Sequence, residues 1–353
     1  MSKKRVTSRM VAERAGVSRT TVSFVLNNVA HANITTATRN RVLSAARDLG
    51  YVPDVAAQAL VSGRSNNIGL ITVAASDQVF LDPHIPNIMT GLFEIARARG
   101  FRLLVEHIDH PDDTETVINL LRSKSIAGAV INWINAEKLL AALSPREEYP
   151  IVIINGAPLD GLYTVSADQT GGVRQALDHL YERGQRRIAC IAYSTPDDSP
   201  TVRERLAIYR AFLAQHHLPF CDGYIQYGEY SVESGRLAMQ ALLNVEPRPT
   251  AVFTFNDTMG FGALHAVRNA GLRVPDDVAI VGFDDNRLSR WMLPALSSVH
   301  VPEIAQGYLA GEQLMRLIHG ETPAERHIRL ETQLIVRESS AKPRECSPPV
   351  AEF

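Results

Sequence analysis

The chain has 353 residues, of which 45% are hydrophobic and 21% are charged, and its formal net charge is −2. This length allows two or three domains with sizeable cores, and the composition is that of an ordinary globular protein rather than a fibrous or disordered one. The three cysteines, Cys190, Cys221 and Cys346, are too widely spaced for a disulfide framework or a zinc site.

The N-terminal residues Met-Ser-Lys-Lys-Arg precede a polar stretch, not the apolar run of a signal peptide. No apolar window approaches the length of about 18 residues that a membrane span needs. We therefore expect a cytoplasmic protein, in a reducing compartment that contains DNA, with no membrane partner.

Residues 7–27 predict two short helices joined by a tight turn. Thr7 is a candidate N-cap for the first helix, Gly16 supplies the backbone freedom of the turn, and Ser18 caps the second helix. On a helical wheel, the inward arc of the second helix comprises Thr21, Val22, Val25 and Leu26. The opposite arc comprises Arg19, Thr20, Ser23 and Phe24. A polar arc with one exposed aromatic ring suits the major groove of DNA, although a helical hairpin with a solvated face has the same pattern.

The charge is unevenly distributed along the chain. Residues 1–65 hold ten Lys or Arg and three Asp or Glu, a net charge of +7, whereas the remaining residues carry −9. A basic N-terminal module on an acidic body indicates a phosphate-backbone contact confined to one end.

A third helix is predicted over residues 36–49, with Thr35 as its N-cap and Gly50 at its end. Three helices define a DNA-binding headpiece over residues 1–53. Residues 54–67 then form a hinge and linker, in which Val55–Leu60 is too short to be a stable helix alone. This segment is either an Ala-rich linker or a hinge helix that forms only on DNA and exposes Leu60 as a wedge.

From residue 68 the pattern becomes α/β, because buried apolar runs alternate with amphipathic helices. Strands are predicted over 68–73, 101–107, 128–132, 151–154, 187–192, 223–227, 250–255, 278–283 and 297–301. Helices are predicted over 86–99, 112–123, 136–143, 168–183, 200–216, 231–243, 257–270 and 303–319. The pattern restarts midway, which indicates two doubly wound lobes with a ligand cleft between them.

The core is therefore expected to span residues 68–340 as two lobes. The first lobe would comprise about 68–166 plus 297–319, and the second about 167–296 plus 320–340. The tail, 341–353, has three prolines and no periodicity, and we expect it to be disordered.

Polar residues follow several predicted strands at the ends that would face the cleft. They are Asn155, Asn256, Asp257, Asp284 and Asp285. Asn and Asp at such positions can be N-caps of the next helix, and for Asp257 this reading is as good as a ligand role. Arg205 adds a bidentate donor and Tyr230 a flat apolar surface. This set suits a polyhydroxylated or planar polar ligand.

Enzyme signatures are weak. The chain has no Gly-x-Gly-x-x-Gly after its first strand, no phosphate-binding Gly-Lys-Ser/Thr loop and no nucleophile elbow. Its eleven histidines show no metal spacing. We expect neither catalytic residues nor a metal or cofactor.

An ordered set of motifs runs from about residue 6 to residue 340. In the N-terminal part these are Val11-Ala12-Glu13-Arg14-Ala15-Gly16-Val17-Ser18-Arg19-Thr20-Thr21-Val22-Ser23, Asn27, Gly50-Tyr51-x-Pro53 and Ala57-x-x-Leu60. Further on they are Asp82-Pro83 ahead of Gly91, Asp168 ahead of Gly172, Phe255-Asn256-Asp257, Gly271-Leu272-x-Val274-Pro275 and Val281-Gly282-Phe283-Asp284-Asp285. In this order they are highly specific, and the chain resembles the lactose repressor / galactose repressor family of bacterial transcription regulators.

The resemblance implies a helix-turn-helix headpiece, a hinge helix and a core like periplasmic sugar-binding proteins, acting as a homodimer on a palindromic operator. Residues in DNA-binding positions are Thr7, Ser18, Arg19, Thr20, Ser23, Phe24, His31, Ala57 and Leu60. Among these, Arg19, Thr20 and Phe24 would face base edges, while Thr7, Ser18 and His31 would contact phosphates. Effector-pocket positions hold His84, Asn155, Arg205, Tyr230, Asn256 and Asp284.

The chain also departs from the family pattern. Phe24 stands where relatives often carry a polar residue, so the base read there should differ, and a thymine methyl is one candidate. Met10 replaces an acidic capping partner, and His84-Ile85 replaces an aromatic pair, which puts ring stacking from the first lobe in doubt. The tail lacks the heptad helix of tetrameric members, which favours a dimer.

We therefore expect an effector-controlled repressor whose operator affinity responds to a sugar or related polyol. Nucleobases and phosphosugars stay open as effectors, as does the choice between inducer and corepressor. The alternative is a sugar-binding or sugar-processing protein that is only tethered to DNA.

Overall fold

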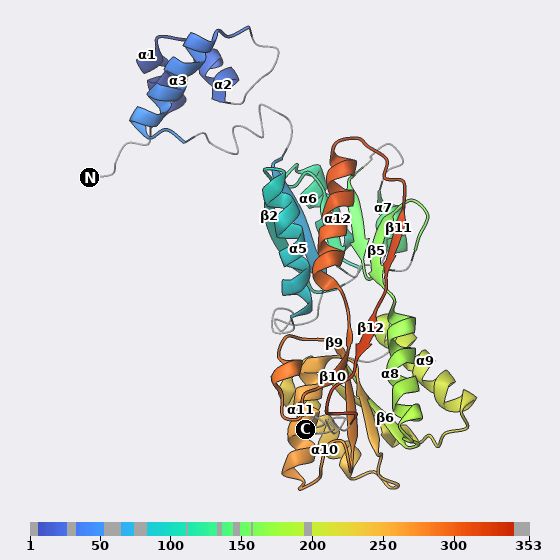
Figure 1. The fold of residues 1–353 in the computed structure, drawn as a ribbon. Coiled ribbons are helices and arrows are strands. Elements are labelled where there is room, and N and C mark those ends of the chain that lie inside the picture. Colours follow the sequence, from blue (N-terminus) through green and yellow to red (C-terminus); the bar gives the residue numbers. More distant parts are fainter. Residues whose placement is uncertain are drawn as a thin grey trace, which may run out of the picture. The chain divides into compact units, whose positions relative to one another are not determined.

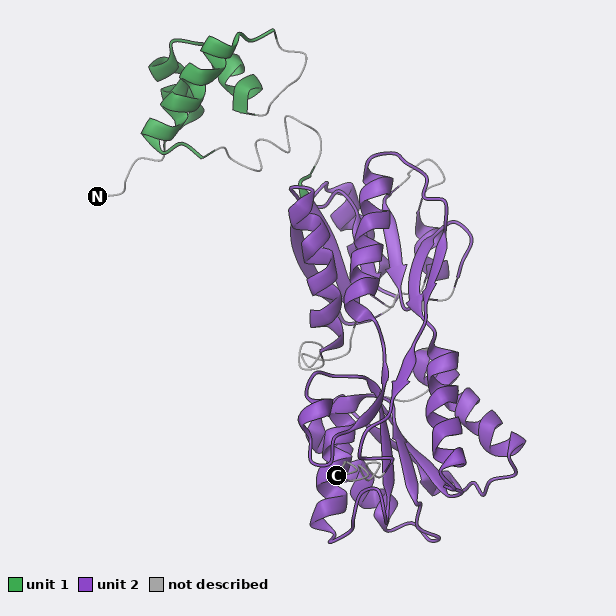
Figure 2. Ribbon diagram, viewed as in Figure 1, with its two compact units in different colours: residues 1–66 green, residues 67–353 purple. Residues whose placement is uncertain are grey.

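The structure is a computed structural model that describes residues 6–26, 33–52, 65–73, 83–110, 112–132, 136–143, 149–156, 158–193 and 200–341. The chain divides into two compact units, residues 1–66 and 67–353 (Figure 2). His31, Ala57 and Leu60 lie outside the described residues, as do most of the expected hinge and all but the first residue of the expected tail.

The first unit contains three helices, α1 (Ser8–Ala15), α2 (Arg19–Leu26) and α3 (Thr36–Leu49). Gly16 and Gly50 end α1 and α3 in the left-handed conformation, with φ of 64° and 65°, which an L side chain rarely adopts. The helices share a small core of buried apolar side chains: Val11, Ala12, Ala15, Val22, Val25, Val42, Ala45 and Ala46.

The first lobe of the second unit is built on a six-stranded sheet with the order β11-β5-β4-β3-β1-β2. The strands are β1 (Asn67–Val73), β2 (Arg102–Ile108), β3 (Ala129–Asn132), β4 (Ile151–Ile154), β5 (Tyr163–Ala167) and β11 (His327–Leu330). Its helices are α5 (His84–Ala98), α6 (Thr114–Arg122), α7 (Ala136–Ala142) and α12 (Glu303–Ile318). All the strand pairs are parallel. One apolar cluster includes side chains of α5 and α12, and another those of α6 and α7, so alternate residues of the central strands are buried on both faces.

The second lobe repeats this plan on a sheet with the order β12-β10-β9-β8-β6-β7 (Figure 1). Its strands are β6 (Ile188–Tyr193), β7 (Ile225–Gly228), β8 (Ala251–Thr254), β9 (Ala279–Asp284), β10 (Ser297–His300) and β12 (Gln333–Ile335). Its helices are α8 (Gln169–Glu182), α9 (Pro200–Gln215), α10 (Val232–Leu243) and α11 (Asp257–Asn269), with short 3₁₀ turns η2 (Asp222–Tyr224) and η3 (Ser289–Trp291). The β10–β12 pair is antiparallel, whereas the other pairs are parallel.

Each lobe contains one very close helix crossing. A Cβ built on Gly307 of α12 would lie 2.1 Å from the carbonyl oxygen of Ile88 in α5. In the second lobe, a Cβ on Gly262 of α11 would lie 2.0 Å from the carbonyl oxygen of Val232 in α10. Only a residue without a Cβ allows backbones to meet this closely, so both crossings require glycine.

The chain passes between the lobes three times, from β5 to α8, from β10 to α12, and from β11 to β12. At the first and third passages, the Asp168 amide donates to the Leu330 carbonyl, and the Thr332 hydroxyl donates to the Asp168 carbonyl. The Asp168 carboxylate also pairs with Arg329. These bonds join two passages that are far apart in sequence.

The lobe boundaries differ from those expected. The sequence predicts that the strand over 297–301 belongs to the first lobe, but β10 pairs with β9 in the second. Residues 320–340 were placed wholly in the second lobe, but β11 pairs with β5 in the first. The predictions also lacked β5, β11 and β12. The last two are edge strands of three or four residues with little full burial, so they have no apolar run to predict them.

Candidate functional site

The second helix of the first unit presents the outward arc that its sequence predicted. Val22 and Val25 are buried, whereas Arg19, Thr20 and Phe24 are exposed. Phe24 is an aromatic ring with 38% of its surface exposed. Ser23 is only half-buried, as are Thr21 and Leu26 on the inward arc. The arrangement leaves a cation, a hydroxyl and an aromatic ring on the surface of one helix.

Of the two predicted N-caps of this hairpin, Ser18 makes a capping hydrogen bond and Thr7 does not. The Ser18 hydroxyl accepts a hydrogen bond of 3.1 Å from the Thr21 amide, so Ser18 caps α2. Thr7 occupies the N-cap position of α1, but its side chain makes no cap hydrogen bond. Thr7 is exposed beside the helix N-terminus, a position at which anions bind favourably.

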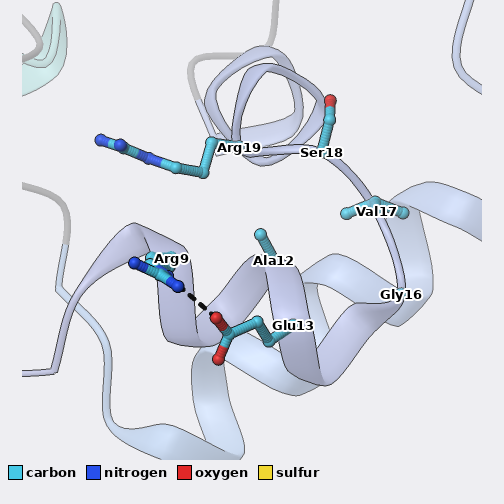
Figure 3. A pocket seen from close by; sticks show the side chains of 7 residues that line it. All are labelled: Arg9, Ala12, Glu13, Gly16, Val17, Ser18 and Arg19. Carbon is cyan, nitrogen blue, oxygen red and sulfur yellow. Dashed lines mark hydrogen bonds and ion pairs between the residues drawn. The ribbon is translucent and has the colours of Figure 1, made fainter.

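A shallow pocket lies between α1 and α2 (Figure 3). It is lined by Arg9, Ala12, Glu13, Gly16, Val17, Ser18 and Arg19. The Arg9 guanidinium forms an exposed ion pair of 3.0 Å with Glu13, one turn along α1. Figure 3 shows the guanidinium groups of Arg9 and Arg19 on the same side of this pocket.

In the second lobe, Asn256 and Asp257 follow β8 and have different partners. The Asn256 carboxamide oxygen accepts a hydrogen bond of 2.9 Å from the Met259 amide and so caps α11. The Asp257 carboxylate accepts three bonds of 2.5–2.7 Å, from Ser289, Ser298 and the Asn286 amide. Burial raises the pKa of the Asp257 carboxyl to about 7, although these three donors act in the opposite direction. Asp257 therefore anchors the loop after β9 rather than capping its own helix.

Arg205 is 3% exposed and lies within a cage of rings and oxygens. Its guanidinium donates to the Gln169 side chain and, at 2.5 Å, to the Phe255 carbonyl. The guanidinium carbon lies 3.8 Å from the Phe283 ring centroid and 5.7 Å from that of Tyr193. Tyr193 in turn stacks on Tyr230, with centroids 4.4 Å apart. Arg205 and Tyr230 thus belong to one polar-aromatic cluster in the second lobe.

The first lobe contributes a hydrogen-bond network centred on His84 and Asn155. The His84 ring lies 2.6 Å from a Glu303 carboxylate oxygen through Nδ1 and 2.9 Å from the Asn155 amide through Nε2. Asn87 donates to the other Glu303 oxygen at 2.7 Å. Asn155 also donates to Asn132 at 3.0 Å, so six polar groups are linked once Gln306 is included.

The acceptors in this network fix the tautomer of His84. The Gln306 amide nitrogen lies 2.9 Å from both the Val165 carbonyl and Asn155 Oδ1, and the carbonyl can only accept. Asn155 must therefore turn its Nδ2 toward His84, whose Nε2 accepts the hydrogen bond. His84 is then neutral, carries its proton on Nδ1 and donates it to Glu303.

Asn87, Asn132, Glu303 and Gln306 were missed in the sequence. Asn132 ends β3, and the rule that located Asn155 would have found it. Glu303 and Gln306 lie one turn apart on the buried face of α12, with exposed fractions of 3% and 0%. Buried polar residues on a mostly apolar helix face, which also holds Gln313, are the signal that could have revealed them.

A small cavity lies between the two lobes, and its volume of about 10 Å³ is roughly the space that one water molecule needs. We call it the interlobe cavity, and it is lined by Pro83, Asn87 and Glu303 of the first lobe and by Asp257, Thr258, Asp284 and Asn286 of the second. Of the predicted effector residues, only Asp284 lines it, while His84 contacts one of its lining residues, Glu303. The carboxyl end of β9 and the N-terminal ends of α5, α11 and α12 meet at this cavity.

Strained backbone occurs at several of the predicted effector residues. Among the described residues other than glycine, six have a positive φ, and they include Asn155 (59°), Tyr230 (57°) and Asp284 (101°). Such conformations cost about 1–3 kcal/mol each and are found most often at ligand sites. Half of the six predicted effector residues thus have strained backbone.

Comparison with known proteins identifies both units. Residues 9–54 match the family described as "Bacterial regulatory proteins, lacI family", and residues 177–340 match the "Periplasmic binding protein-like domain". The regulator CelR of Thermobifida fusca is 34% identical over 340 residues, which cover 96% of this chain and 99% of CelR. The chain belongs to the LacI family of bacterial regulatory proteins. It is a DNA-binding transcriptional repressor with an effector-binding core, and not an enzyme.

Other LacI-family members are similar over nearly their full length. The repressor CytR of Escherichia coli is 32% identical over 95% of this chain and 96% of its own. A solved CelR–cellobiose complex has a TM-score of 0.68 and 32% identity, covering 95% of this chain and all of that one. A lac repressor dimer, solved with operator and the anti-inducer ONPF, has a TM-score of 0.82 and 26% identity, covering 96% and 99%.

The described residues contain neither a candidate membrane span nor a candidate metal cluster. Their helices are all too short or too polar to cross a lipid bilayer. Nor do these residues contain a group of three or more His, Cys, Asp or Glu that could hold a metal ion.

Proposed function

We propose that this LacI-family repressor binds a palindromic operator as a homodimer, and that a sugar or related polyol held between the lobes controls its affinity. The observation that carries this proposal is the meeting of both lobes at the interlobe cavity, where carboxylates and amides of α5, α12, β9 and α11 converge. Such groups suit the hydroxyls of a polyol.

In the headpiece, Arg19, Thr20 and Phe24 would contact base edges, with Ser23 beside them on the same arc. Thr7, Ser18 and His31 would bind phosphates, and Ala57 and Leu60 would enter the minor groove. Exposure of Arg19, Thr20 and Phe24 on one side of α2 supports the first of these roles.

In the core, His84, Asn155, Arg205, Tyr230, Asn256 and Asp284 would surround the effector. Three observations support the assignment of these residues to the effector pocket: the stacking of Tyr230 on Tyr193, the burial of the Arg205 guanidinium and the strained backbone of Asp284. Because CelR has been solved with cellobiose, a sugar is the first effector class to examine.

Control would operate through the three interlobe passages. An effector that binds one arrangement of the lobes more tightly shifts the population toward that arrangement. In a dimer this rotation would change the spacing of the paired hinge segments and so the operator affinity, with a coupling energy of about 1–3 kcal/mol.

Homodimer formation is supported by an exposed apolar patch in the second lobe. Trp291 and Leu293 are 77% and 83% exposed, and Leu288 beside them is 57% exposed. Several large apolar side chains that are exposed close together in sequence are typical of a protein interface.

The test is operator binding by the full chain at several salt concentrations, with a selected operator and a scrambled duplex of equal length. We expect a steep fall in affinity with salt for both, and tighter binding to the operator by about three orders of magnitude or more. Equal affinity for the two duplexes would contradict the proposal and favour a sugar-binding protein that is merely tethered to DNA.

The effector is then sought by a thermal-shift screen of sugars, polyols, nucleobases and phosphosugars. A compound present at 100 times its Kd should stabilise the core by about 2.7 kcal/mol. The compounds that bind are added to the operator titration, which shows whether each acts as an inducer or a corepressor.

A further inference from the structure

The interlobe cavity is unusually acidic. Asp257, Asp284 and Glu303 all line it, and none of the described residues that line it is basic. One of these carboxylates belongs to the first lobe and two to the second, so they face a shared space from opposite walls. An anionic ligand would be repelled there, whereas hydroxyl or ammonium donors would be attracted.

Glu303 is a buried carboxylate of this set that accepts fewer hydrogen bonds than Asp257, which has three donors. It is 3% exposed, and within the described part of the chain its only ion-pair partner is His84. Because the network assigns a neutral ring to His84, the carboxylate accepts two hydrogen bonds but faces no positive charge. A carboxylate has about four acceptor positions, so roughly two are left for further donors.

A second acceptor lies on the same helix face. Oε1 of Gln306, one turn beyond Glu303, is buried and has no hydrogen-bond partner among the described residues. An unpaired buried oxygen is destabilising unless a donor reaches it. Gln306 is fully buried and does not line the interlobe cavity, so Glu303 is the α12 residue that offers acceptor positions to it.

We propose that Glu303 is an effector-binding and specificity-determining residue that, opposite Asp284, selects neutral or cationic polyhydroxylated effectors and rejects phosphorylated ones. This inference rests on the proposed function and names the ligand class of its site. The ligand bridges the two walls by donating hydroxyl or ammonium hydrogens to both carboxylates. It thereby relieves the repulsion that arises when the lobes approach each other.

A purely structural role for Glu303 is the competing explanation. A carboxylate in the first turn of a helix is favoured by the helix dipole, and Glu303 also links α12 to α5 through His84 and Asn87. That role predicts lower stability on substitution but no change in which ligands bind.

The experiment uses three β-1,4-linked disaccharides of matched shape and different charge: cellobiose, the glucosamine dimer of chitosan, and cellobiose 6′-phosphate. Their affinities for the full chain are measured by titration calorimetry. We expect the neutral and diamino probes to bind at least about tenfold more tightly than the phosphate, a difference of about 1.4 kcal/mol.

The variants are Glu303→Gln and, as a matched control on α12, Glu312→Gln. Glu303→Gln should reduce the preference for the diamino probe over the phosphate by about tenfold, whereas Glu312→Gln should leave it unchanged. Asp284→Asn, on the opposite wall, should reduce it similarly and serves if Glu303→Gln fails to fold.

Three results would overturn the proposal. They are phosphate binding as tight as that of cellobiose, an unchanged preference in Glu303→Gln, and no binding of the diamino probe at its solubility limit. Operator binding by the same samples distinguishes failure of the Glu303 proposal from failure of the proposed function. A protein that fails the three tests above but still binds its operator sequence-specifically retains the proposed DNA-binding function.

Discussion

The guanidinium carbon of Arg205 lies 3.8 Å from the ring centroid of Phe283, and the same guanidinium donates to the Phe255 carbonyl. This places a buried cation between the ends of β8 and β9, held by a ring on one side and an oxygen on the other. Cation–π contacts of desolvated groups contribute about 2 kcal/mol or more. Arg205 is therefore both part of the proposed effector pocket and a link between neighbouring strands.

Arg205→Lys should abolish the effector response while leaving operator affinity within about twofold, because an ammonium cannot reproduce the planar fork or its stacking. The measurement is operator titration with and without a sugar identified in the screen. Loss of operator binding together with the response would show that Arg205 does not belong to the pocket.

Phe24→Ala should weaken operator binding by about 1–3 kcal/mol and relax the preference at one base pair, because the exposed ring would no longer contact a thymine methyl. Competition between operator variants substituted at each position measures both effects. Met10→Ala, which removes another exposed apolar side chain (40% exposed) from the headpiece, is the control. An equal loss on every duplex would argue against a base contact by Phe24.

Asp257 should make stability depend on pH. Its pKa rises from 3.8 to about 7 on folding, so between these values the folded protein binds more protons than the unfolded chain. The contribution of Asp257 to stability is therefore fully present below about pH 4 and is lost as the pH rises through 7, by about 4 kcal/mol at most. Melting curves at several pH values should show this slope in the wild type.

In Asp257→Asn the slope should be smaller, because the carboxamide cannot titrate and can still bond to both serines and the Asn286 amide. An identical pH profile in the variant would mean that other groups dominate the dependence.

Gly307→Ala should destabilise the first lobe by about 1–3 kcal/mol or more, since its Cβ would lie 2.1 Å from the Ile88 carbonyl oxygen. Ala305→Gly, at an exposed position of the same helix, should cost only about 1 kcal/mol through helix propensity. Chemical denaturation distinguishes them, and equal effects would mean that the crossing relaxes easily.

The elements that could be predicted carry their signals locally. Helix α3 has the predicted bounds, residues 36–49, because Thr35 caps its start and Gly50 ends it in the left-handed conformation. The buried central strands were found from their apolar runs. Edge strands β11 and β12 were missed because their pairing depends on distant partners, β5 and β10.

The first-lobe part of the site shows the same limit. His84 and Glu303 are hydrogen-bonded although 219 residues separate them in the chain. No local pattern around Glu303 indicates this partner, because the passage from β10 into α12 brings the residue there. Asn256 and Asp284 could be predicted, since Asp284 ends β9 and Asn256 lies two residues beyond the end of β8.

The late position of β11 and β12 has a consequence for synthesis of the protein. Each lobe receives one edge strand from residues 327–335, and the first lobe also receives α12 from residues 303–318. Neither lobe can therefore complete its sheet while these residues are still inside the ribosome. A chain interrupted between residue 53 and residue 327 would have its headpiece but no finished core. The cell thus obtains a chain in which the DNA-reading headpiece and a finished ligand-sensing core are both present only at the end of translation.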